Sequence, residues 1–255
     1  MKIDFFLGTF AFIFGMVFGS FFNVCIYRIP LNLSVSKPSS HCPSCKHTLS
    51  PLDLVPIFSW IFLKGKCRYC GEKISVRYAI VELVTAVLFV LVFLRFGYTW
   101  VCLAMMAFVS VLLIVSMIDI NYQIIPDSVL IFGGVVGIIS VIFELYVSWK
   151  SSLIGLAVVP LPLLIIYFVA ILIYKKEALG FGDIKLMAVV GLFLGWKIGL
   201  LSLVLGIYLA GIYGIILLVF KKGKRSDIFA FGPFLCGGTL IALLLGNEIL
   251  MLYFR

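Results

Sequence analysis

The chain has 255 residues, of which 64% are hydrophobic and 12% are charged, and its mean hydropathy is +1.24. A water-soluble domain usually carries about 25% charged and about 45–50% apolar residues, so this composition excludes an ordinary soluble globule. The net charge of +9 does not require a nucleic-acid partner, and none is expected, because membrane topology accounts for the charge.

The apolar residues form long runs without the alternation of barrel strands, and in lipid such runs must fold as helices. Runs of spanning length cover 5–27, 78–96, 99–118, 128–148, 153–174, 198–220 and 228–253, with a shorter glycine-rich run at 184–196. No small-residue cleavage site follows the first run, so we expect a retained helix and not a signal peptide. The sequence predicts an all-α polytopic membrane bundle of about eight transmembrane helices.

Basic residues indicate the orientation, because the cytoplasmic loops of membrane proteins are enriched in Lys and Arg. With the N-terminus outside, the inner segments hold fifteen of the twenty Lys and Arg residues. The sequence therefore predicts a multi-pass protein that is surrounded by the lipid bilayer. The polar segment 28–77 then lies on the cytoplasmic side.

The segment 28–77 contains two C-x-x-C pairs, Cys42 with Cys45 and Cys67 with Cys70. Their spacing is close to that of a zinc ribbon, in which two turns bring four thiolates to one tetrahedral ion. A segment of this length has little hydrophobic core, and metal binding would supply folding free energy. We expect a small zinc-ribbon-like cytoplasmic insertion with a structural zinc ion on these four cysteines.

Other interpretations of the cysteines stay open from spacing alone. The pairs could be redox-active dithiols, and His41 or His47 could replace one cysteine ligand. A reducing cytoplasm disfavours structural disulfides. Cys25, Cys102 and Cys236 lie singly in apolar runs, where we expect them to pack as small hydrophobic residues.

Two aspartates stand at the predicted inner membrane edge, where carboxylates are energetically expensive. Asp119 follows the run 99–118, and Asp183 follows Gly180 and Gly182. Two helices separate the aspartates, so the chain returns to the same side and the two carboxyl groups can meet. A close pair shares one proton, which suits acid–base hydrolysis of a peptide bond.

Each of these carboxyl groups also has a structural interpretation. Asp183 could be the N-cap of its helix, and Asp119 could be an interfacial residue. Asp127 follows Pro126, and we expect it mainly to cap the next helix. Lys185 could pair with Asp183 or mark the cytoplasmic face.

The motifs around the aspartates resemble those of the bacterial type IV prepilin peptidases, which are GxGD-type membrane aspartic proteases. Gly180-Phe181-Gly182-Asp183 matches the GxGD motif, and Asp119 opens the second catalytic motif, D-I-N-Y-Q-I-I-P-D. Further matches, spread over nearly the whole chain, are Gly19-Ser20-Phe21-Phe22-Asn23-Val24, Tyr27-Arg28-Ile29-Pro30, Val55-Pro56, Ser59-Trp60, Ile74-Ser75, Val81-Glu82-Leu83 and Phe231-Gly232-Pro233-Phe234.

The resemblance implies that Asp119 and Asp183 are catalytic. They would activate water to cut the basic leader from pilin or pseudopilin precursors at the cytoplasmic face of the bacterial inner membrane. The resemblance also implies methylation of the new N-terminal residue, commonly a phenylalanine, with S-adenosylmethionine, but it does not identify the residues that bind this methyl donor.

Under this interpretation the chain divides into three parts. They are a first transmembrane helix (1–27), a zinc-binding insertion associated with methyl transfer (28–77) and a peptidase core (78–255). Three rival functions remain: a peptidase without methyl transfer, a proton- or cation-coupled transporter, and a non-catalytic assembly scaffold. The double C-x-x-C argues against a transporter, and the intact aspartate pair argues against a scaffold.

Overall fold

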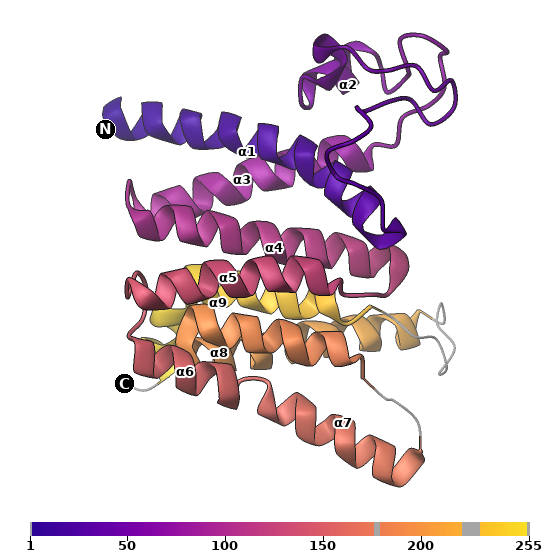
Figure 1. Cartoon of the computed structure of the whole chain (residues 1–255). Coiled ribbons are helices and arrows are strands. Elements are labelled where there is room, and N and C mark those ends of the chain that lie inside the picture. Colours follow the sequence, from indigo (N-terminus) through magenta and orange to yellow (C-terminus); the bar gives the residue numbers. More distant parts are fainter. Residues whose placement is uncertain (1, 176–178, 221–229, 254–255) are drawn as a thin grey trace. The chain divides into compact units, whose positions relative to one another are not determined.

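The computed structural model describes residues 2–175, 179–220 and 230–253, and the regular structure in these residues is helical (Figure 1). The α-helices are α1 (Lys2–Arg28), α2 (Phe58–Phe62), α3 (Arg77–Phe96), α4 (Trp100–Tyr122), α5 (Asp127–Ile142), α6 (Trp149–Val158), α7 (Leu161–Tyr174), α8 (Phe181–Val219) and α9 (Gly232–Tyr253). Two 3₁₀ turns, η1 (Ile29–Leu31) and η2 (Pro51–Leu54), lie within the insertion 28–77. The predicted all-α fold is confirmed. The basic stretch 221–225 lies outside the described residues.

Six helical segments are long and apolar enough to cross a membrane. They are Phe6–Leu31, Arg77–Phe96, Trp100–Tyr122, Trp149–Ile173, Phe181–Val219 and Gly232–Leu252. Two features explain the difference from the expected number of about eight. The predicted run 128–148 becomes α5, which has only 16 residues. The runs 184–196 and 198–220 are the two arms of a single bent helix, α8.

The structure divides into two compact units, Met1–Tyr98 and Thr99–Arg255. In the first unit, α1 and α3 approach closely because two glycines on α1 face the backbone of α3. A Cβ on Gly15 would lie 2.6 Å from Cα of Ala86, and one on Gly19 would lie 2.6 Å from Cα of Glu82. This is the packing that glycines four residues apart permit between membrane helices.

The insertion between α1 and α3 is held by polar contacts to the main chain. The buried guanidinium of Arg28 donates to the carbonyls of Ser34 at 2.9 Å and Pro38 at 2.7 Å. The indole Nε1 of Trp60 donates to the carbonyl of Ile74 at 3.1 Å. These bonds give shape to a segment that has few buried apolar side chains of its own.

In the second unit, α4 is the most enclosed span, with 72% of its apolar window buried. The first arm of α8 contacts α4 through the stacked rings of Phe108 and Phe193, whose centroids lie 4.2 Å apart. Helix α6 crosses this arm at main-chain contact, since a Cβ on Gly155 would lie 2.3 Å from the carbonyl oxygen of Gly191. The first arm of α8 is therefore fixed along its length.

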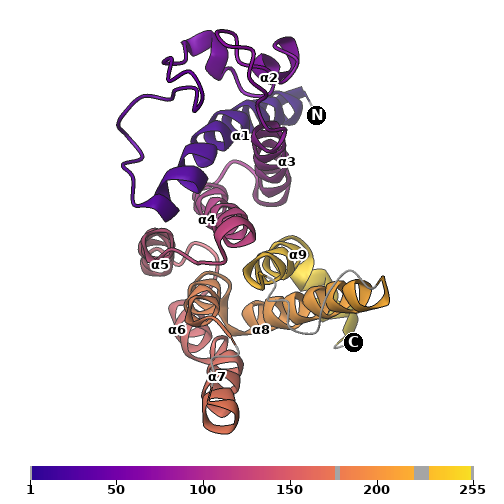
Figure 2. The ribbon, with the colours of Figure 1, turned by 90° about the vertical axis from the view of Figure 1, so that its right-hand side faces the viewer.

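The bend in α8 occurs at Gly195, whose φ of 70° and ψ of −179° are open only to glycine. Figure 2 shows the two arms of α8 running in clearly different directions. Because the arms diverge, the second arm packs against α9 while the first packs against α6. The bend brings α9 beside the rest of the second unit.

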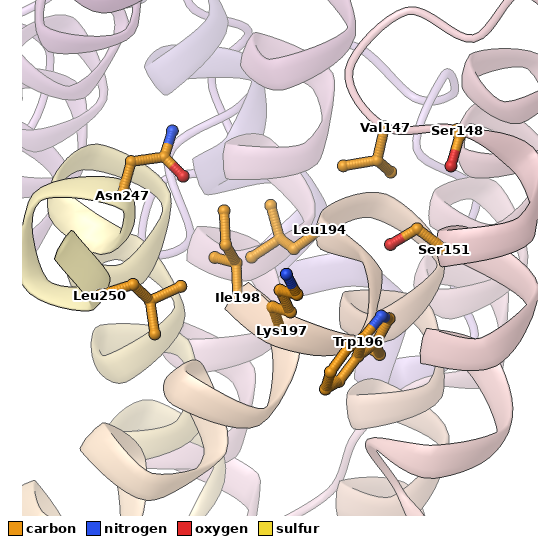
Figure 3. Close-up of a pocket in the computed structure, with 9 residues that line it drawn as sticks. All are labelled: Val147, Ser148, Ser151, Leu194, Trp196, Lys197, Ile198, Asn247 and Leu250. Atoms are coloured by element: carbon orange, nitrogen blue, oxygen red, sulfur yellow. The ribbon is translucent and has the colours of Figure 1, made fainter. Parts of the chain in front are cut away.

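A shallow cavity of about 390 Å³ lies at this bend (Figure 3). Its lining comes from the start of α6, the bend of α8 and the end of α9, and consists of Val147, Ser148, Ser151, Leu194, Trp196, Lys197, Ile198, Asn247 and Leu250. Asp183 begins the other end of the first arm. This cavity is therefore separate from the two aspartates singled out by the sequence.

Candidate functional site

Asp119 lies in the last turn of α4 and is 6% exposed. Its Oδ2 accepts a hydrogen bond from the main-chain N–H of Gly232 at 2.9 Å. Gly232 begins α9, so this N–H belongs to the first turn of a helix, where the positive end of the dipole favours an anion. A Cβ on Gly232 would lie 2.7 Å from the same oxygen, and only glycine allows this approach.

Asp183 lies in the first turn of α8 and is 7% exposed. Its N–H donates to the carbonyl of Gly180 at 3.1 Å, which closes the turn that carries the GxGD motif. A Cβ on Gly182 would lie 2.8 Å from Cβ of Ile125, in the loop between α4 and α5. Glycine at 182 thus lets the start of α8 pack directly beneath the loop that follows Asp119.

The two aspartates come together in the second unit, as their topology predicted. Gly182, next to Asp183, packs against Ile125, six residues beyond Asp119, so the end of α4 and the start of α8 that carry the two aspartates lie close together. Within the described residues, Oδ1 of Asp183 is buried and has no hydrogen-bond partner. The arrangement therefore has two buried carboxyl groups, of which one retains a free acceptor oxygen.

The expected capping role of Asp127 was wrong, and two open interpretations, a cap at Asp183 and its pairing with Lys185, do not hold. The N-cap of α8 is Gly180 and that of α5 is Pro126, and neither helix has a side-chain cap, so Asp183 and Asp127 are not caps. Lys185 pairs with Asp127, with 2.7 Å between Nζ and Oδ1, and not with Asp183. Asp127 stands at the first helical position after Pro126, and its exposed carboxylate bonds Lys185 on α8.

The four predicted metal ligands meet in the first unit. The sulfur atoms of Cys42, Cys45, Cys67 and Cys70 all lie within 4.8 Å of one another. Tetrahedral coordination with metal–sulfur bonds of about 2.3 Å requires sulfur–sulfur distances of about 3.8 Å. The Sγ atoms of Cys42 and Cys70 are 3.8 Å apart. The cysteines thus form one four-sulfur cluster with the dimensions of a single metal site, and not two separate dithiols.

The two C-x-x-C turns repeat the same main-chain pattern. Cys42 N donates to the carbonyl of His47, and Cys67 N donates in the same way to that of Glu72. The N–H groups of Lys46 and Gly71 close both turns onto the first cysteine, and both residues have positive φ. The N–H of Cys45, followed by that of Ser44, lowers the pKa of the Cys42 thiol to about 6 despite its burial. The main-chain N–H groups of the first turn thus favour the thiolate of Cys42, the form that binds metal.

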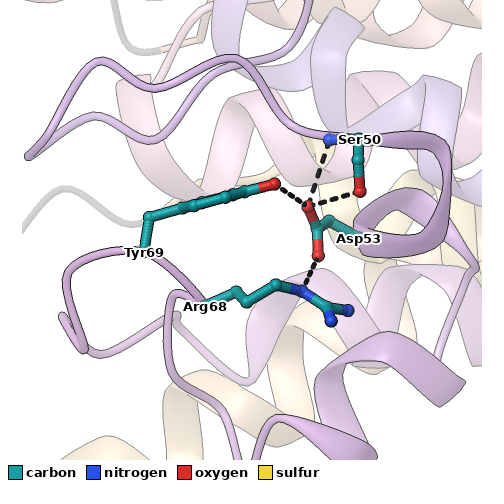
Figure 4. A network of polar contacts seen from close by, with 4 residues as sticks. All are labelled: Ser50, Asp53, Arg68 and Tyr69. Atoms are coloured by element: carbon teal, nitrogen blue, oxygen red, sulfur yellow. Dashed lines mark hydrogen bonds and ion pairs between the residues drawn. The ribbon is translucent and has the colours of Figure 1, made fainter.

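A carboxylate joins the 3₁₀ turn η2 to the second C-x-x-C turn (Figure 4). Asp53 accepts from the N–H and hydroxyl of Ser50, from the Tyr69 hydroxyl at 3.0 Å and from Arg68 Nε at 2.6 Å. Its side chain is only 3% exposed. Burial opposes ionisation, but the bonds from Ser50, Arg68 and Tyr69 outweigh it and lower the pKa of Asp53 to about 2. Asp53 therefore holds the second C-x-x-C turn against η2.

The histidines beside the first pair are not in the four-sulfur cluster. The ring of His47 lies against that of Tyr69, with centroids 3.7 Å apart, and Nδ1 of His41 lies 3.1 Å from the carbonyl of Ser39. Cys25, Cys102 and Cys236 are buried and free, as expected for packing residues.

Comparison with known proteins agrees with this geometry. Residues 13–96 match the bacterial peptidase A24 N-terminal domain, and residues 106–215 match the type IV leader peptidase family. A protein of Bacillus subtilis named prepilin leader peptidase/N-methyltransferase is 36% identical over 96% of this chain and 96% of its own length. The chain belongs to the type IV leader peptidase family.

Other relatives carry the same name. The protein of Stutzerimonas stutzeri is 32% identical over 96% of this chain and 93% of its own length. That of Pseudomonas aeruginosa is 32% identical over 94% of this chain and 91% of its own length. No solved structure matches this chain.

Sequence reasoning missed one polar cluster in this family member. Glu82, in α3, is only 8% exposed, and its Oε2 accepts from the N–H of Ile57 at 2.7 Å. Gly15 and Gly19 could have indicated it, because their four-residue spacing predicts a close helix crossing. Glu82 lies one helical turn before Ala86, which Gly15 contacts, so the carboxyl group of Glu82 falls inside that crossing.

Proposed function

We propose that this chain is a membrane peptidase that cleaves the leader from prepilins or pseudopilins with Asp119 and Asp183, and that it then methylates the new N-terminal residue. The observation that carries the peptidase assignment is the pair of buried carboxyl groups, one bonded to the first turn of α9 and one with a free oxygen. Proteins with this pair of activities in their names match nearly the whole chain.

The chemistry of the aspartate pair follows from its surroundings. Two adjacent buried carboxyl groups hold one proton between them, because two adjacent negative charges repel. The N–H of Gly232 favours the ionised form at Asp119, and Asp183 has its unbonded Oδ1 available to a substrate. The ionised carboxylate takes a proton from water, and the protonated carboxyl polarises the scissile carbonyl.

The proposed orientation places both aspartates and the insertion on the cytoplasmic side. The basic residues support it, because fifteen of twenty fall on that side. A pilin precursor has a basic leader in front of an apolar helix, so its scissile bond lies where that helix enters the membrane. The last turn of α4 and the first turn of α8 carry the aspartates at ends of spanning segments, which suits such a bond.

Zinc is the metal that the four-cysteine cluster suits best. Four thiolates at tetrahedral separations select Zn²⁺ among common cytoplasmic ions, and a site with four protein ligands is closed to substrate. Lys46, Lys66 and Arg68 flank the cysteines and offset the charge of four thiolates. In this proposal the ion stabilises the insertion 28–77 and has no part in peptide hydrolysis.

We assign methyl transfer to the same chain because relatives of similar length are named for it. S-adenosylmethionine would supply an electrophilic methyl group. The proposal divides the chain into a first membrane helix (1–27), a zinc-binding insertion associated with methyl transfer (28–77) and a peptidase core (78–255). The alternative is a peptidase without methyl transfer.

One experiment separates these possibilities. Purified protein is incubated with a prepilin and S-adenosylmethionine, and the N-terminal peptide of the product is weighed by mass spectrometry. Loss of the leader together with a gain of one methyl group supports both activities. A cleaved but unmodified product limits the chain to peptidase activity. An intact prepilin contradicts the proposal.

A further inference from the structure

A second cluster of buried polar groups lies on the α1–α3 crossing, where the insertion meets the helices. It shares no residue with the aspartate pair or with the four-cysteine cluster. Its centre is the carboxyl of Glu82, which accepts from the main-chain N–H of Ile57 and from the side chain of Ser20. All the groups bonded to this carboxyl are neutral donors.

Asn23 adds an acceptor to the same crossing. It is 5% exposed, and its Nδ2 donates to the carbonyl of Tyr78 at 3.0 Å. Tyr78 precedes Glu82 by one turn of α3, and Gly19, which contacts Cα of Glu82, precedes Asn23 by one turn of α1. Within the described part of the chain, Oδ1 of Asn23 is buried and has no hydrogen-bond partner.

Ile57 is held in a backbone conformation that β-branched residues avoid. Its φ is 64° and its ψ is −54°, and Phe58 N donates to the carbonyl of Pro56 at 2.6 Å across it. These values describe a strained γ-turn. Such strain persists only where the surroundings determine it, and it concentrates at functional sites. Here the Glu82 carboxylate captures the N–H of the strained residue.

The charge of this cluster is unbalanced. The carboxyl groups of Asp53 and Asp127 form ion pairs, whereas the described partners of the Glu82 carboxyl, Ile57 N–H and Ser20, are both uncharged. A buried carboxylate is stable when a cation accompanies it. The carboxylate has acceptor sites beyond its two bonds, and Asn23 offers another acceptor. A group with several N–H donors and a positive charge complements this set.

We propose that Glu82 and Asn23 bind the N-terminal ammonium of the mature pilin and present its nitrogen for methylation. This inference rests on the proposed methyl transfer. Phe21, Ile80 and Leu83 are close to the cluster in the sequences of α1 and α3, and their apolar side chains are exposed. They suit an ammonium that begins an apolar helix better than they suit a nucleoside.

The chemical step balances with the carboxylate as proton acceptor. The ammonium gives one proton to Glu82, and the freed nitrogen lone pair attacks the methyl carbon of S-adenosylmethionine. The N–C bond forms while the C–S bond breaks, and the bonding electrons stay on sulfur. Glu82 then releases its proton to water. The protein supplies the base and the position of the nitrogen.

The test compares Glu82→Gln with the unaltered protein. Gln keeps the acceptor for Ile57 N–H and the side-chain shape, but it removes the charge. Binding is measured in detergent for a short pilin peptide with a free N-terminus and for its N-acetyl counterpart. The unaltered protein should prefer the free amine by about 10- to 100-fold, as expected for a charge-assisted hydrogen bond. The Gln variant should lose that preference.

The same variant is tested for methyl transfer to the pre-cleaved peptide, so that the result does not depend on leader cleavage. Methylation should fall in Glu82→Gln and recover partly in Glu82→Asp. The matched control is Thr85→Val, which changes a buried hydroxyl in the same crossing whose described hydrogen bond goes to its own helix, at the Val81 carbonyl. Metal content reports whether each variant keeps its insertion folded.

The outcomes distinguish this inference from the proposed function. If the unaltered protein does not methylate, the proposed methyl transfer fails. If the unaltered protein methylates and Glu82→Gln retains both the rate and the preference for the free amine, the assignment of Glu82 is overturned. It is also overturned if the variant weakens binding of S-adenosylmethionine and leaves binding of the amine unchanged.

Discussion

The main-chain N–H of Gly232 donates a hydrogen bond to Oδ2 of Asp119 across 113 residues of sequence. This bond joins the end of α4 to the beginning of α9 and gives the Asp119 carboxylate a fixed orientation. Phe231-Gly232-Pro233-Phe234 therefore has a physical role beside the aspartates. Oδ2 of Asp119 has a fixed partner, whereas Oδ1 of Asp183 has none among the described residues.

Replacing either aspartate by asparagine should abolish leader cleavage. Asp119→Asn and Asp183→Asn keep the side-chain shape but remove the proton acceptor, which costs about 10²- to 10⁴-fold in rate for acid–base catalysis. The double variant should be hardly slower than each single one, because the residues act as a unit. Cleavage of a prepilin in detergent provides the measurement.

Asp127→Asn is the matched control for that experiment. It lies eight residues from Asp119, but its partner is Lys185 in an exposed ion pair. Exposed pairs contribute at most about 1 kcal/mol to stability, so this variant should cleave at nearly the normal rate. Substantial cleavage by Asp183→Asn would remove the central claim.

A methyl group at position 232 should inactivate the peptidase without unfolding it. Gly232→Ala places a Cβ 2.7 Å from Oδ2 of Asp119, so the carboxyl must move. A displacement of about 1 Å can cost about 100-fold in rate. Gly211→Ala, on the second arm of α8, is the control, since a Cβ there meets nothing within 4 Å. Equal activity of the two variants would contradict the orienting role of Gly232.

Purified protein should contain about one zinc ion per chain, as a four-thiolate site requires. Cys45→Ser should lower the metal content and make the insertion sensitive to protease, while Cys102→Ala should leave the metal content unchanged. Elemental analysis and limited proteolysis provide the two measurements. Metal-free protein that is freshly reduced and active would refute the zinc assignment.

Asp53 should stabilise the insertion in a manner that depends on pH. Its folded pKa of about 2 lies below the ordinary value of 3.8, so its contribution is present above about pH 4 and is lost as the pH falls towards 2. Asp53→Asn removes charge-assisted bonds that contribute about 1–3 kcal/mol each at neutral pH. Proteolysis of the insertion measures this loss.

The control for Asp53 is Glu72→Gln, which changes an exposed carboxylate whose described hydrogen bond comes from the main-chain N–H of its neighbour Lys73. It should leave the rate of proteolysis unchanged. The Asp53→Asn insertion should be cut faster at pH 7 than the unaltered one. Identical rates for all three proteins would show that the hydrogen bonds of Asp53 in Figure 4 do not stabilise the insertion.

The orientation of the chain is open to a direct test. A reporter active only outside the cytoplasm should be inactive when fused after Lys224 and active when fused after Lys150. The reason is the distribution of basic residues, which places the first position inside and the second outside. Opposite results at both positions would reverse the orientation and place the cysteines outside the reducing compartment.

Much of the fold was predictable because its signals are local. Hydropathy predicted the helices. The spacing of the cysteines predicted the four-sulfur cluster, because a C-x-x-C turn brings its own two sulfur atoms together. Asp119 and Asp183 were identified because carboxylates at membrane edges are rare. Their meeting followed from counting the helices between them.

The remaining features depend on partners that are distant in sequence. Nothing near Lys185 indicates that Asp127 is its partner, and nothing near Glu82 indicates the N–H of Ile57. The bend at Gly195 could not be predicted either, because a glycine within an apolar run is compatible with both a straight and a bent helix. Such choices depend on tertiary packing, which local patterns do not report.

The contact between Gly155 and Gly191 gives the first arm of α8 a fixed point. Eight residues separate Gly191 from Asp183, so at 1.5 Å per residue the carboxylate stands about 12 Å from that point. A tilt of about 5° there would shift Asp183 by about 1 Å, enough to impair catalysis. The two glycines in this crossing thus determine the position of a reactive carboxylate two turns away. Helix α6 carries no proposed catalytic residue, but it holds that carboxylate in place.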